Sequence, residues 1–331
     1  MQEGSRRAIV AAFLANLGIA VAKLVGFLIT GSAGLLAEAG HSIADTGNQG
    51  LLMLGGKRSR REATSDHPFG YGSERYFWAF VVALVLFSMG GLFALYEGIS
   101  KLRHPHTTDN PVVAFVILGL AVALETYSLR TAMGEANHIK PRSMSWWRFI
   151  RTAKQAELPV VLLEDVGAEV GLLFALGGLA LAEITGNPRW DAVGSLAIGL
   201  LLVVIAVILA VETKGLLIGE AASGPAKDAL HTALEATPGL QRVIHLRTLH
   251  LGPDELLVAA KVEFDAGISF AELSARIDRA EAAMRAAVPQ ATVIYLEPDV
   301  YRPTDGAPGA TDGANGVDGA TDGADDVSAR P

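Results

Sequence analysis

Six apolar blocks, each long enough to cross a lipid bilayer, most constrain what this chain can fold into. A helix needs about 20 residues to span the roughly 30 Å hydrocarbon core of a membrane, and each block has close to that length. The pattern predicts a polytopic α-helical membrane protein with six transmembrane helices. The blocks are Ala8–Ile29, Gly34–Gly55, Phe77–Ile99, Pro111–Met133, Leu158–Leu181 and Asp191–Val211.

The composition supports a membrane protein and excludes several other classes. Of the 331 residues, 50% are hydrophobic and 19% are charged, and the mean hydropathy is positive, which disfavours an ordinary soluble globule. Because the chain has no cysteine, it cannot form a disulfide, a thiolate metal ligand or a thiol redox centre. No broad basic surface indicates a nucleic-acid partner. The first apolar block continues into a second one and lacks the cleavage site of a signal peptide.

Basic residues between the blocks predict how the chain is oriented in the membrane. They gather before the first block, between the second and third, and between the fourth and fifth, whereas the other loops hold few. By the positive-inside rule, we expect both termini in the cytoplasm of an integral protein of a bacterial-type plasma membrane. The loop of residues 134–157 mixes Trp146, Trp147 and Phe149 with basic residues, which is typical of a short amphipathic helix at the inner interface.

The chain changes character after residue 218, and we divide it into three parts. Residues 1–218 are the predicted transmembrane domain. Residues 219–300 have the αββαβ order of a small ferredoxin-like α+β domain, which we place in the cytoplasm. Residues 301–331 repeat Gly, Ala, Asp and Thr, and are predicted to form a disordered acidic tail because they cannot bury a core. The elements predicted in the second part are helix Pro225–Thr237, strands Val243–Leu251 and Glu255–Phe264, helix Ser269–Val288 with a Ser cap, and strand Thr292–Leu296.

A polar stripe crosses the second apolar block. Glu38, His41, Asp45 and Asn48 follow one another at spacings of three, four and three residues, which keeps their side chains near one face of a helix. A charged side chain near the bilayer centre costs about 2.5–3.5 kcal/mol on insertion scales, so such a stripe is a candidate functional site. A His and an Asp one helical turn apart can also bind a divalent metal ion.

A second polar cluster lies in the fifth block, where Glu164, Asp165 and Glu169 stand among apolar residues. Asp165 and Glu169 are one turn apart, whereas Glu164 points about 100° away on an ideal helix. If the second and fifth helices pack side by side, two residues from each converge near the middle of the membrane. The alternative is structural pairing, for which Lys23 in the first block could supply a partner, but so many buried acids favour a metal or proton pathway. The candidate metal ligands are His41, Asp45, Asp165 and Glu169.

Three further acids in or beside the blocks have simpler interpretations. Glu97 and Glu125 lie near the ends of predicted helices, where their side chains are expected to reach the membrane interface. Asp191 stands at the start of the sixth block, where we expect it to cap its own helix.

Several motifs resemble those of the cation diffusion facilitator family. The run from Ser32 to Asp45, SAGLLAEAGHSIAD, looks like the second-helix signature of that family, and His67–Gly72, HPFGYG, looks like the loop that follows it. The αββαβ domain after a sixth span is similar to the family's C-terminal domain, so the resemblance covers about residues 8–300. Asn48-Gln49, Leu163-Glu164-Asp165 and Thr185-Gly186-Asn187-Pro188 further resemble the zinc transporter 9 branch.

The resemblance implies a secondary transporter, not an enzyme, without a prosthetic group. Such a protein forms a homodimer through its C-terminal domain and exports divalent cations, usually Zn²⁺, from the cytoplasm in exchange for protons. His41 and Asp45 match the family's transport-site ligands directly. In the fifth helix Asp165 stands where the family has His, and Glu169 where it has Asp, which hardens the site towards Mn²⁺ or Fe²⁺. Secondary ligand candidates are Glu164, Asn48 and Glu38.

Two accessory metal sites known in the family look degraded here. His67 remains in the loop after the second block, but Tyr71 occupies a position that is His in some relatives. In the C-terminal domain, Lys261 and Tyr295 replace His ligands, and His245 is out of register. We therefore expect this domain to dimerise without a metal cluster. A non-transporting membrane metal sensor or scaffold is the alternative function, whereas no nucleophile, phosphate loop or cofactor motif favours a membrane enzyme.

Overall fold

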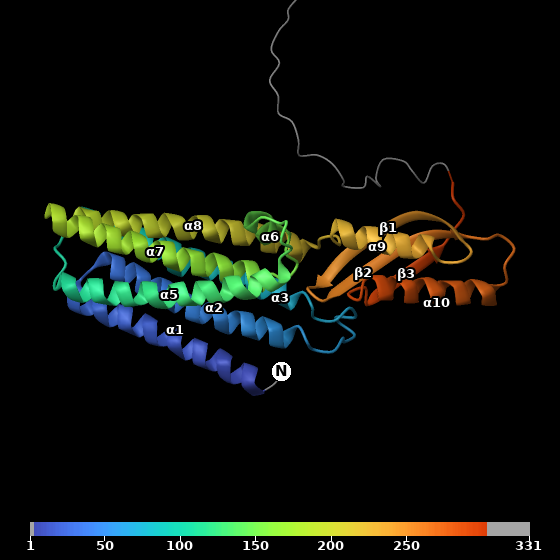
Figure 1. Ribbon diagram of the computed structural model, residues 1–331, viewed down its shortest axis with the longest axis horizontal. Coiled ribbons are helices and arrows are strands. Elements are labelled where there is room, and N and C mark those ends of the chain that lie inside the picture. The colour runs from blue at the N-terminus through green and yellow to red at the C-terminus, as the bar shows by residue number, and fades with distance from the viewer. Residues whose placement is uncertain (1–2, 303–331) are drawn as a thin grey trace, which may run out of the picture.

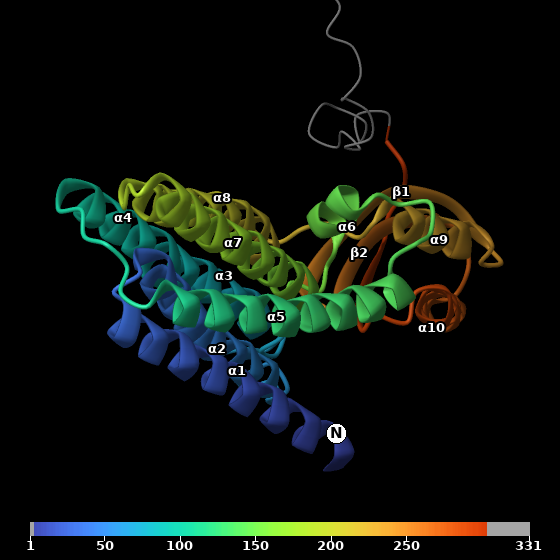
Figure 2. The same cartoon turned by 60° about the vertical axis from the view of Figure 1, so that its left-hand side comes forward.

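The computed structural model describes residues 3–302, which form a bundle of long helices with a small α+β domain at one end (Figure 1). One long helix is composite, because α3 (Glu74–Val85) continues through a π-helical segment, η1 (Leu86–Leu92), into α4 (Phe93–Arg103). The short helix α6 (Trp146–Thr152) lies beside the small domain (Figure 2), and its place at the inner membrane interface stays a prediction. The other helices of the bundle are α1 (Glu3–Thr30), α2 (Ala33–Arg58), α5 (Pro111–Ile139), α7 (Glu157–Thr185) and α8 (Arg189–Ile218).

The outside of the bundle is apolar, as a membrane-embedded surface requires. Three stretches of the described chain are long and apolar enough to cross a membrane, namely Glu74–Arg103, Pro111–Gly134 and Arg189–Ile218. The helices α1, α2 and α7 pack alongside them. Leu28 and Ile184 are 72% and 81% exposed on the bundle surface, which lipid would cover. The helical membrane fold is confirmed, and the count of six crossings stays a prediction.

Helix α2, which carries the first polar stripe, lies inside the bundle between α1, α3, α7 and α8. It begins after Ser32, whose hydroxyl accepts a hydrogen bond from the Leu35 amide at 3.3 Å. Lys57 and Arg58 stand in its last turn, where positive charge stabilises the end of a helix. The core around it includes the fully buried side chains of Leu35, Leu86, Leu118, Leu172, Ile198 and Leu202.

Helices α7 and α8 approach each other through glycine. A Cβ atom built on Gly178 of α7 would lie 2.8 Å from the Trp190 carbonyl oxygen, and one on Gly194 of α8 would lie 2.8 Å from the Phe174 carbonyl oxygen. Any side chain at either position would therefore force the two backbones apart. This contact fixes where α7, the carrier of the second polar cluster, lies in the bundle.

The C-terminal domain has the αββαβ order that the sequence predicts. Strands β1 and β2 pair antiparallel, and β2 pairs with β3 in parallel, giving the sheet order β1-β2-β3. Ser269 caps α10 by accepting a hydrogen bond from the Glu272 amide at 3.2 Å, as predicted. The core between helices and sheet includes Leu230, Leu234, Val258, Val262 and Met284. The elements are α9 (Gly224–Glu235), β1 (Leu240–Gly252), β2 (Glu255–Phe264), α10 (Phe270–Ala287) and β3 (Val293–Pro298). The predicted disorder of the tail falls on residues 303–331, which lie outside the described part of the chain.

The C-terminal domain is joined to the bundle by more than the chain connection. The turn between β1 and β2 lies against the start of α3, where Ser73 Oγ donates a hydrogen bond of 2.9 Å to the Leu251 carbonyl. Arg75 Nη1 forms an ion pair of 3.0 Å with Asp254, and its Nε pairs with Glu157 at the start of α7. Arg75 thus links helices α3 and α7 to the turn between β1 and β2.

Candidate metal site

The polar stripe on α2 faces inward, as its spacing predicts. Glu38, His41 and Asn48 are fully buried, and Asp45 is 16% exposed at its side chain. The Nε2 atom of His41 lies 3.4 Å from Oδ2 of Asp45, one helical turn further along. The two residues are therefore close enough to bind one cation together.

Several polar atoms of this stripe have no hydrogen-bond partner among the described residues. They include both ring nitrogens of His41 and Oδ1 of Asp45. A buried polar atom without a partner costs about 1–3 kcal/mol, so such atoms are rare in a settled structure. Imidazole nitrogen and carboxylate oxygen are the ligands that Zn²⁺ binds in proteins. The donor set around His41 and Asp45 therefore fits a metal ion.

The acids of α7 contact two different helices. Glu164 accepts a hydrogen bond of 2.5 Å from the Asn48 side-chain amide, which ties α7 to α2. Asp165 and Glu169 instead face α5, where they accept hydrogen bonds from Ser128 Oγ at 3.4 Å and Thr126 Oγ1 at 2.9 Å.

A small cavity of about 30 Å³ lies where α2, α5 and α7 meet. Its lining brings together Asp45 from the first cluster, Glu164 and Asp165 from the second, and Glu125 of α5. His41 and Glu169 do not line it, and no three His, Asp or Glu side chains of the described chain are arranged to hold a metal. The structure thus brings together part of the expected ligand set, and the assignment of the four ligands stays a prediction.

Glu125 is the site residue that the sequence interpretation missed. It was expected to reach the membrane interface, but it lies in the middle of α5 and lines the cavity. A signal was present, because Glu125 and Ser128 are three residues apart and therefore lie near one face of the helix.

Lys23 of α1 supplies the buried positive charge beside the site. Its Nζ atom lies 3.0 Å from Glu38 Oε2 and donates a hydrogen bond of 2.8 Å to Ser42 Oγ. Both charged side chains are buried from solvent. The pairing considered for Lys23 is therefore present at Glu38, and Glu38 is engaged with a counter-charge rather than exposed to the cavity.

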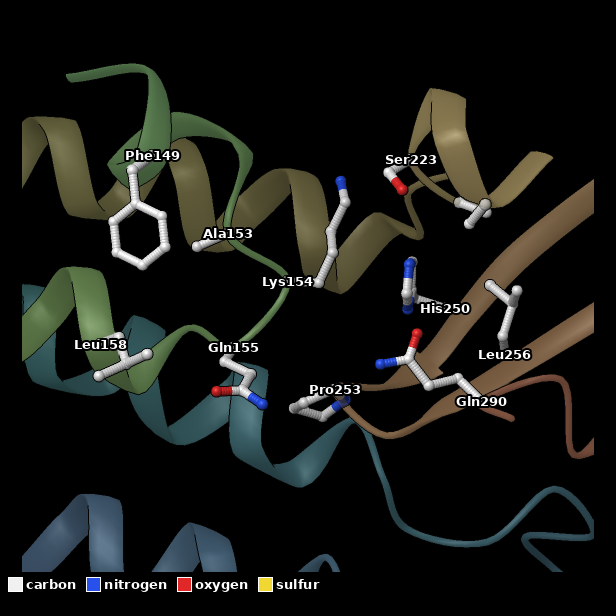
Figure 3. Close-up of a pocket in the computed structure, with 12 residues that line it drawn as sticks. Phe149, Ala153, Lys154, Gln155, Leu158, Ser223, His250, Pro253, Leu256 and Gln290 are labelled. Atoms are coloured by element: carbon white, nitrogen blue, oxygen red, sulfur yellow. The ribbon is translucent and has the colours of Figure 1, made fainter. Parts of the chain in front are cut away.

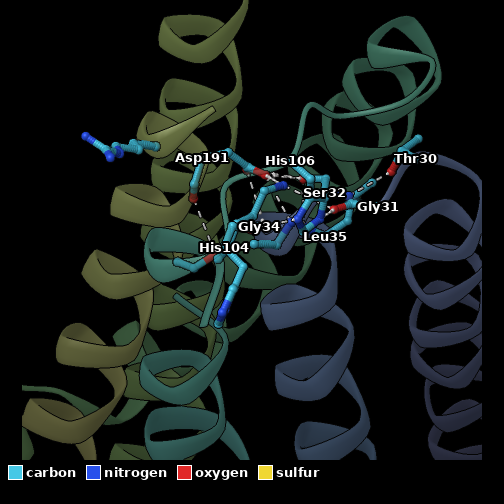
Figure 4. A network of polar contacts seen from close by, with 12 residues as sticks. Thr30, Gly31, Ser32, Gly34, Leu35, His104, His106 and Asp191 are labelled. Carbon is cyan, nitrogen blue, oxygen red and sulfur yellow. Dashed lines mark hydrogen bonds and ion pairs between the residues drawn. The ribbon is translucent and has the colours of Figure 1, made fainter. Parts of the chain in front are cut away.

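The far end of α2 is held by a second buried network (Figure 4). Asp191 at the start of α8 accepts hydrogen bonds from Ser32 Oγ at 3.2 Å and from the amides of Ala33 at 3.0 Å and Gly34 at 3.3 Å. Lys101 forms an ion pair of 2.7 Å with the same carboxylate. The expectation that Asp191 caps its own helix is wrong: it caps α2, because the first amides of α2 point at it and attract negative charge.

The residues of the two accessory metal sites have other contacts. In the loop after α2, His67 stacks on Tyr71 with ring centroids 4.5 Å apart. In the C-terminal domain, Lys261 lies opposite His245 in the β1–β2 register and pairs with Glu297 at 3.1 Å and Asp299 at 3.0 Å. Hydrogen bonds with these two acids raise the pKa of Lys261. Dimerisation of this domain without a metal cluster stays a prediction.

Comparison with known families decides what kind of protein carries this site. A sequence model of the cation efflux transmembrane domain matches residues 9–218, and one of the cation efflux protein cytoplasmic domain matches residues 223–299. The chain belongs to the cation efflux family. This confirms the resemblance to cation diffusion facilitators, and the matched transmembrane domain together with the apolar helices makes this family member an integral membrane protein.

Named relatives agree with this assignment. The human proton-coupled zinc antiporter SLC30A9, mitochondrial, is 31% identical over 244 residues, which cover 73% of this chain and 43% of that protein. Metal tolerance protein C4 of Arabidopsis thaliana is 28% identical over 262 residues, or 79% of this chain and 57% of that one. Zinc transporter ZitB of Pectobacterium atrosepticum is 24% identical over 238 residues, or 72% and 64%. The chain thus spans about half the length of the first two relatives, and the resemblance to the zinc transporter 9 branch is confirmed.

Proposed function

We propose that this cation efflux protein exports a divalent transition-metal cation, foremost Zn²⁺, from the cytoplasm in exchange for protons. The observation that carries the proposal is the buried pair of His41 and Asp45, with three atoms lacking partners, next to a cavity lined by acids from three helices. The similarity to the proton-coupled zinc antiporter SLC30A9 and the zinc transporter ZitB supports zinc as the cargo. The proposed ligands are His41, Asp45, Asp165 and Glu169, with Glu164 as an additional carboxylate.

The acid-lined cavity supplies a physical reason for proton coupling. Negative charges repel one another strongly at low dielectric, so Asp45, Glu125, Glu164 and Asp165 require protons or a cation. A metal ion that binds these oxygens must displace the protons they hold, since ligands bind metal in their deprotonated form. Metal and protons therefore compete for the same atoms, which is the requirement for exchange.

The two ends of α2 differ in a way that supports alternating access. The cavity touches Asp45 and Gln49, which follow His41 towards the C-terminal domain. The opposite end of α2 is closed by the network of Asp191 and Lys101. We infer that the cavity admits metal from the side of the C-terminal domain, and that a relative movement of α2 and α7 adds His41 and Glu169 to the ligand set.

The orientation, the membrane and the assembly are part of the same proposal. The charge asymmetry of the loops supports a cytoplasmic location for both termini and for residues 219–300. Residues 223–299 match the cytoplasmic domain of cation efflux proteins, which supports a homodimer formed through this part. A bacterial-type plasma membrane stays our prediction, whereas the human relative SLC30A9 is a mitochondrial protein by name. Membrane fractionation of native cells decides between these compartments.

Flux of Zn²⁺ into proteoliposomes with an imposed pH gradient tests the function. Asp45→Asn should reduce the flux by at least about a hundredfold, because one ligand and its charge are lost. Glu183→Gln is the matched control, since this acid lies on the exposed side of the same helix as Asp165. Equal flux by the wild type and Asp45→Asn would overturn the proposal. Tight metal binding without flux in the wild type would instead favour a sensor or scaffold.

Mn²⁺ or Fe²⁺ is a second candidate cargo, because carboxylates outnumber imidazoles among the proposed ligands. Oxygen ligands suit these harder ions better than a His-rich site does. Competition among Zn²⁺, Mn²⁺ and Fe²⁺ in the flux assay tests this directly. Inhibition of zinc flux by equimolar Mn²⁺ would assign the harder ion.

A further inference from the structure

A cavity larger than that of the metal site lies between the helix bundle and the C-terminal domain. Its volume is about 190 Å³, against about 30 Å³ for the acid-lined cavity. Figure 3 shows its walls, with Phe149 and Leu158 on the side of the bundle and His250, Ser223 and Gln290 on the side of the domain. This cavity therefore contacts both the helix bundle and the C-terminal domain, and the transport proposal gives it no role.

Several groups around this cavity can donate hydrogen bonds to a ligand. Helix α9 begins at the cavity after Ser223, whose side chain makes no capping hydrogen bond, so the amides of Gly224 and Ala226 lack that partner, while Pro225 between them has no N–H group. The Lys154 ammonium group and the side-chain amides of Gln155 and Gln290 also line it. No carboxylate occurs among the described residues of the lining.

His250 provides an independent sign that a ligand binds here. The residue is only 6% exposed, yet Nδ1 has no hydrogen-bond partner among the described residues. Its ring stands in the cavity between Lys154 and Gln290 (Figure 3). Burial, followed by the charge of Lys154, lowers the pKa of His250, so an anion is the partner that would restore its positive charge.

Glu220, the acid next to Lys154, does not line this cavity. Glu220 pairs with Lys154, and its Oε1 atom lies against Gly215 of α8. Glu220 lines a separate, smaller pocket on the other side of the α6–α7 connection. Lys154 keeps two further N–H groups for a ligand, since an ammonium group has three donors.

We propose that this cavity binds a phosphate group between the two parts of the protein, carried by an anionic phospholipid headgroup or by free inorganic phosphate. The amides at the start of α9, together with Lys154 and His250, would donate to its oxygens, as helix N-termini and cationic side chains do in phosphate sites. The apolar wall of Phe149 and Leu158, next to the interfacial helix α6, suits the uncharged part of a lipid. A bound phosphate would hold the C-terminal domain against the bundle.

The test uses the full-length protein in phosphatidylcholine nanodiscs and follows its thermal unfolding. One arm adds inorganic phosphate, and the other replaces part of the lipid by phosphatidylglycerol. Stabilisation by phosphatidylglycerol alone assigns a lipid headgroup, and stabilisation by inorganic phosphate assigns the free anion; both support the proposal. If neither raises the unfolding temperature above that in sodium chloride of equal ionic strength, the proposal is wrong.

Two variants locate the site. His250→Gln should weaken the binding that stabilises the protein by about tenfold, because one charge-assisted hydrogen bond is lost. His245→Gln is the matched control, since this histidine lies on the same strand but does not line the cavity. Gln290→Glu places a repelling carboxylate at an exposed position of the rim and keeps the test decisive if His250→Gln does not fold. Unchanged binding in Gln290→Glu, or equal loss in His245→Gln, would overturn the assignment.

Discussion

Removing the charge of Asp191 is the sharpest test of how α2 is held in the bundle. Asp191→Asn keeps the shape of the side chain and one oxygen that can accept from the α2 amides. The substitution removes the negative charge that lies 2.7 Å from the Lys101 ammonium group in the wild type. Lys101 is only 1% exposed, so water cannot replace this partner. Losing one partner of a buried ion pair typically costs about 3–5 kcal/mol, and we expect Asp191→Asn to fall in that range.

Removing the other partner of the ion pair should reduce the free energy of unfolding less, because Asp191 has further hydrogen-bond donors. In Lys101→Met the carboxylate keeps hydrogen bonds from Ser32 Oγ and the amides of Ala33 and Gly34. We expect a loss of about 1–3 kcal/mol, the cost of a strong hydrogen bond to a charged group. The double variant Asp191→Asn/Lys101→Met buries no unpaired charge and should be more stable than Asp191→Asn alone.

Equilibrium unfolding in mixed micelles with increasing SDS measures the three variants and their coupling free energy. Glu212→Gln is the matched control, since it breaks the pair with Arg151, whose side chain is 58% exposed, and should cost less than about 1 kcal/mol. The reasoning is refuted if Asp191→Asn costs no more than this control. It is also refuted if the double variant loses the sum of the two single losses.

Three further outcomes follow from the same contacts. A Cβ on Gly171 would lie 2.7 Å from Glu38 Oε1, so Gly171→Ala should destabilise the protein by about 1–3 kcal/mol and slow zinc flux, whereas Gly177→Ala, which faces open space, should do neither. Burial and then Lys154 lower the pKa of His250, while the nearby Gly252 backbone and the charge of Glu220 oppose this. The neutral ring is thus favoured on folding, so without phosphate the thermal unfolding temperature should hold above about pH 6.5 and fall as the pH drops below it, less so in His250→Gln. Ser269→Ala removes the cap of α10 and should cost about 1 kcal/mol in urea unfolding.

The parts of the fold that the sequence predicts are those governed by local periodicity. The spacing of Glu38, His41, Asp45 and Asn48 determines a helical face, and a face so polar in an apolar helix must turn away from lipid. The αββαβ order follows in the same way from alternating and helical patterns. Glycine and capping residues at the ends of these elements add local signals, as Ser269 does for α10.

What the sequence does not contain is the rotation of each helix and the identity of its distant partners. Asp191 was expected to cap the helix on which it stands. The groups that donate hydrogen bonds to its carboxylate instead belong to Ser32, Ala33 and Gly34, which precede it by more than 150 positions in the chain. Glu125 was placed near an interface because the predicted span ended at Met133, whereas α5 continues to Ile139 and Glu125 faces the cavity. Glu169 has the spacing of a ligand, yet its hydrogen bond goes to Thr126. Tertiary packing decides each of these cases, and packing is set by contacts across the bundle.

On the proposed function, the position of His41 relative to the cavity suggests an order of events. Three proposed oxygen ligands line the same cavity, namely Asp45, Glu164 and Asp165. The Oδ2 atom of Asp45 also lies 3.4 Å from Nε2 of His41. Asp45 is therefore the one ligand that can bind an incoming ion in the cavity and keep it while the imidazole joins. Because Lys23 is paired with Glu38, the other acids of the site must be neutralised by protons or by the ion itself. A dication that enters replaces protons on those oxygens before it reaches His41, which makes proton release part of binding rather than a separate later step.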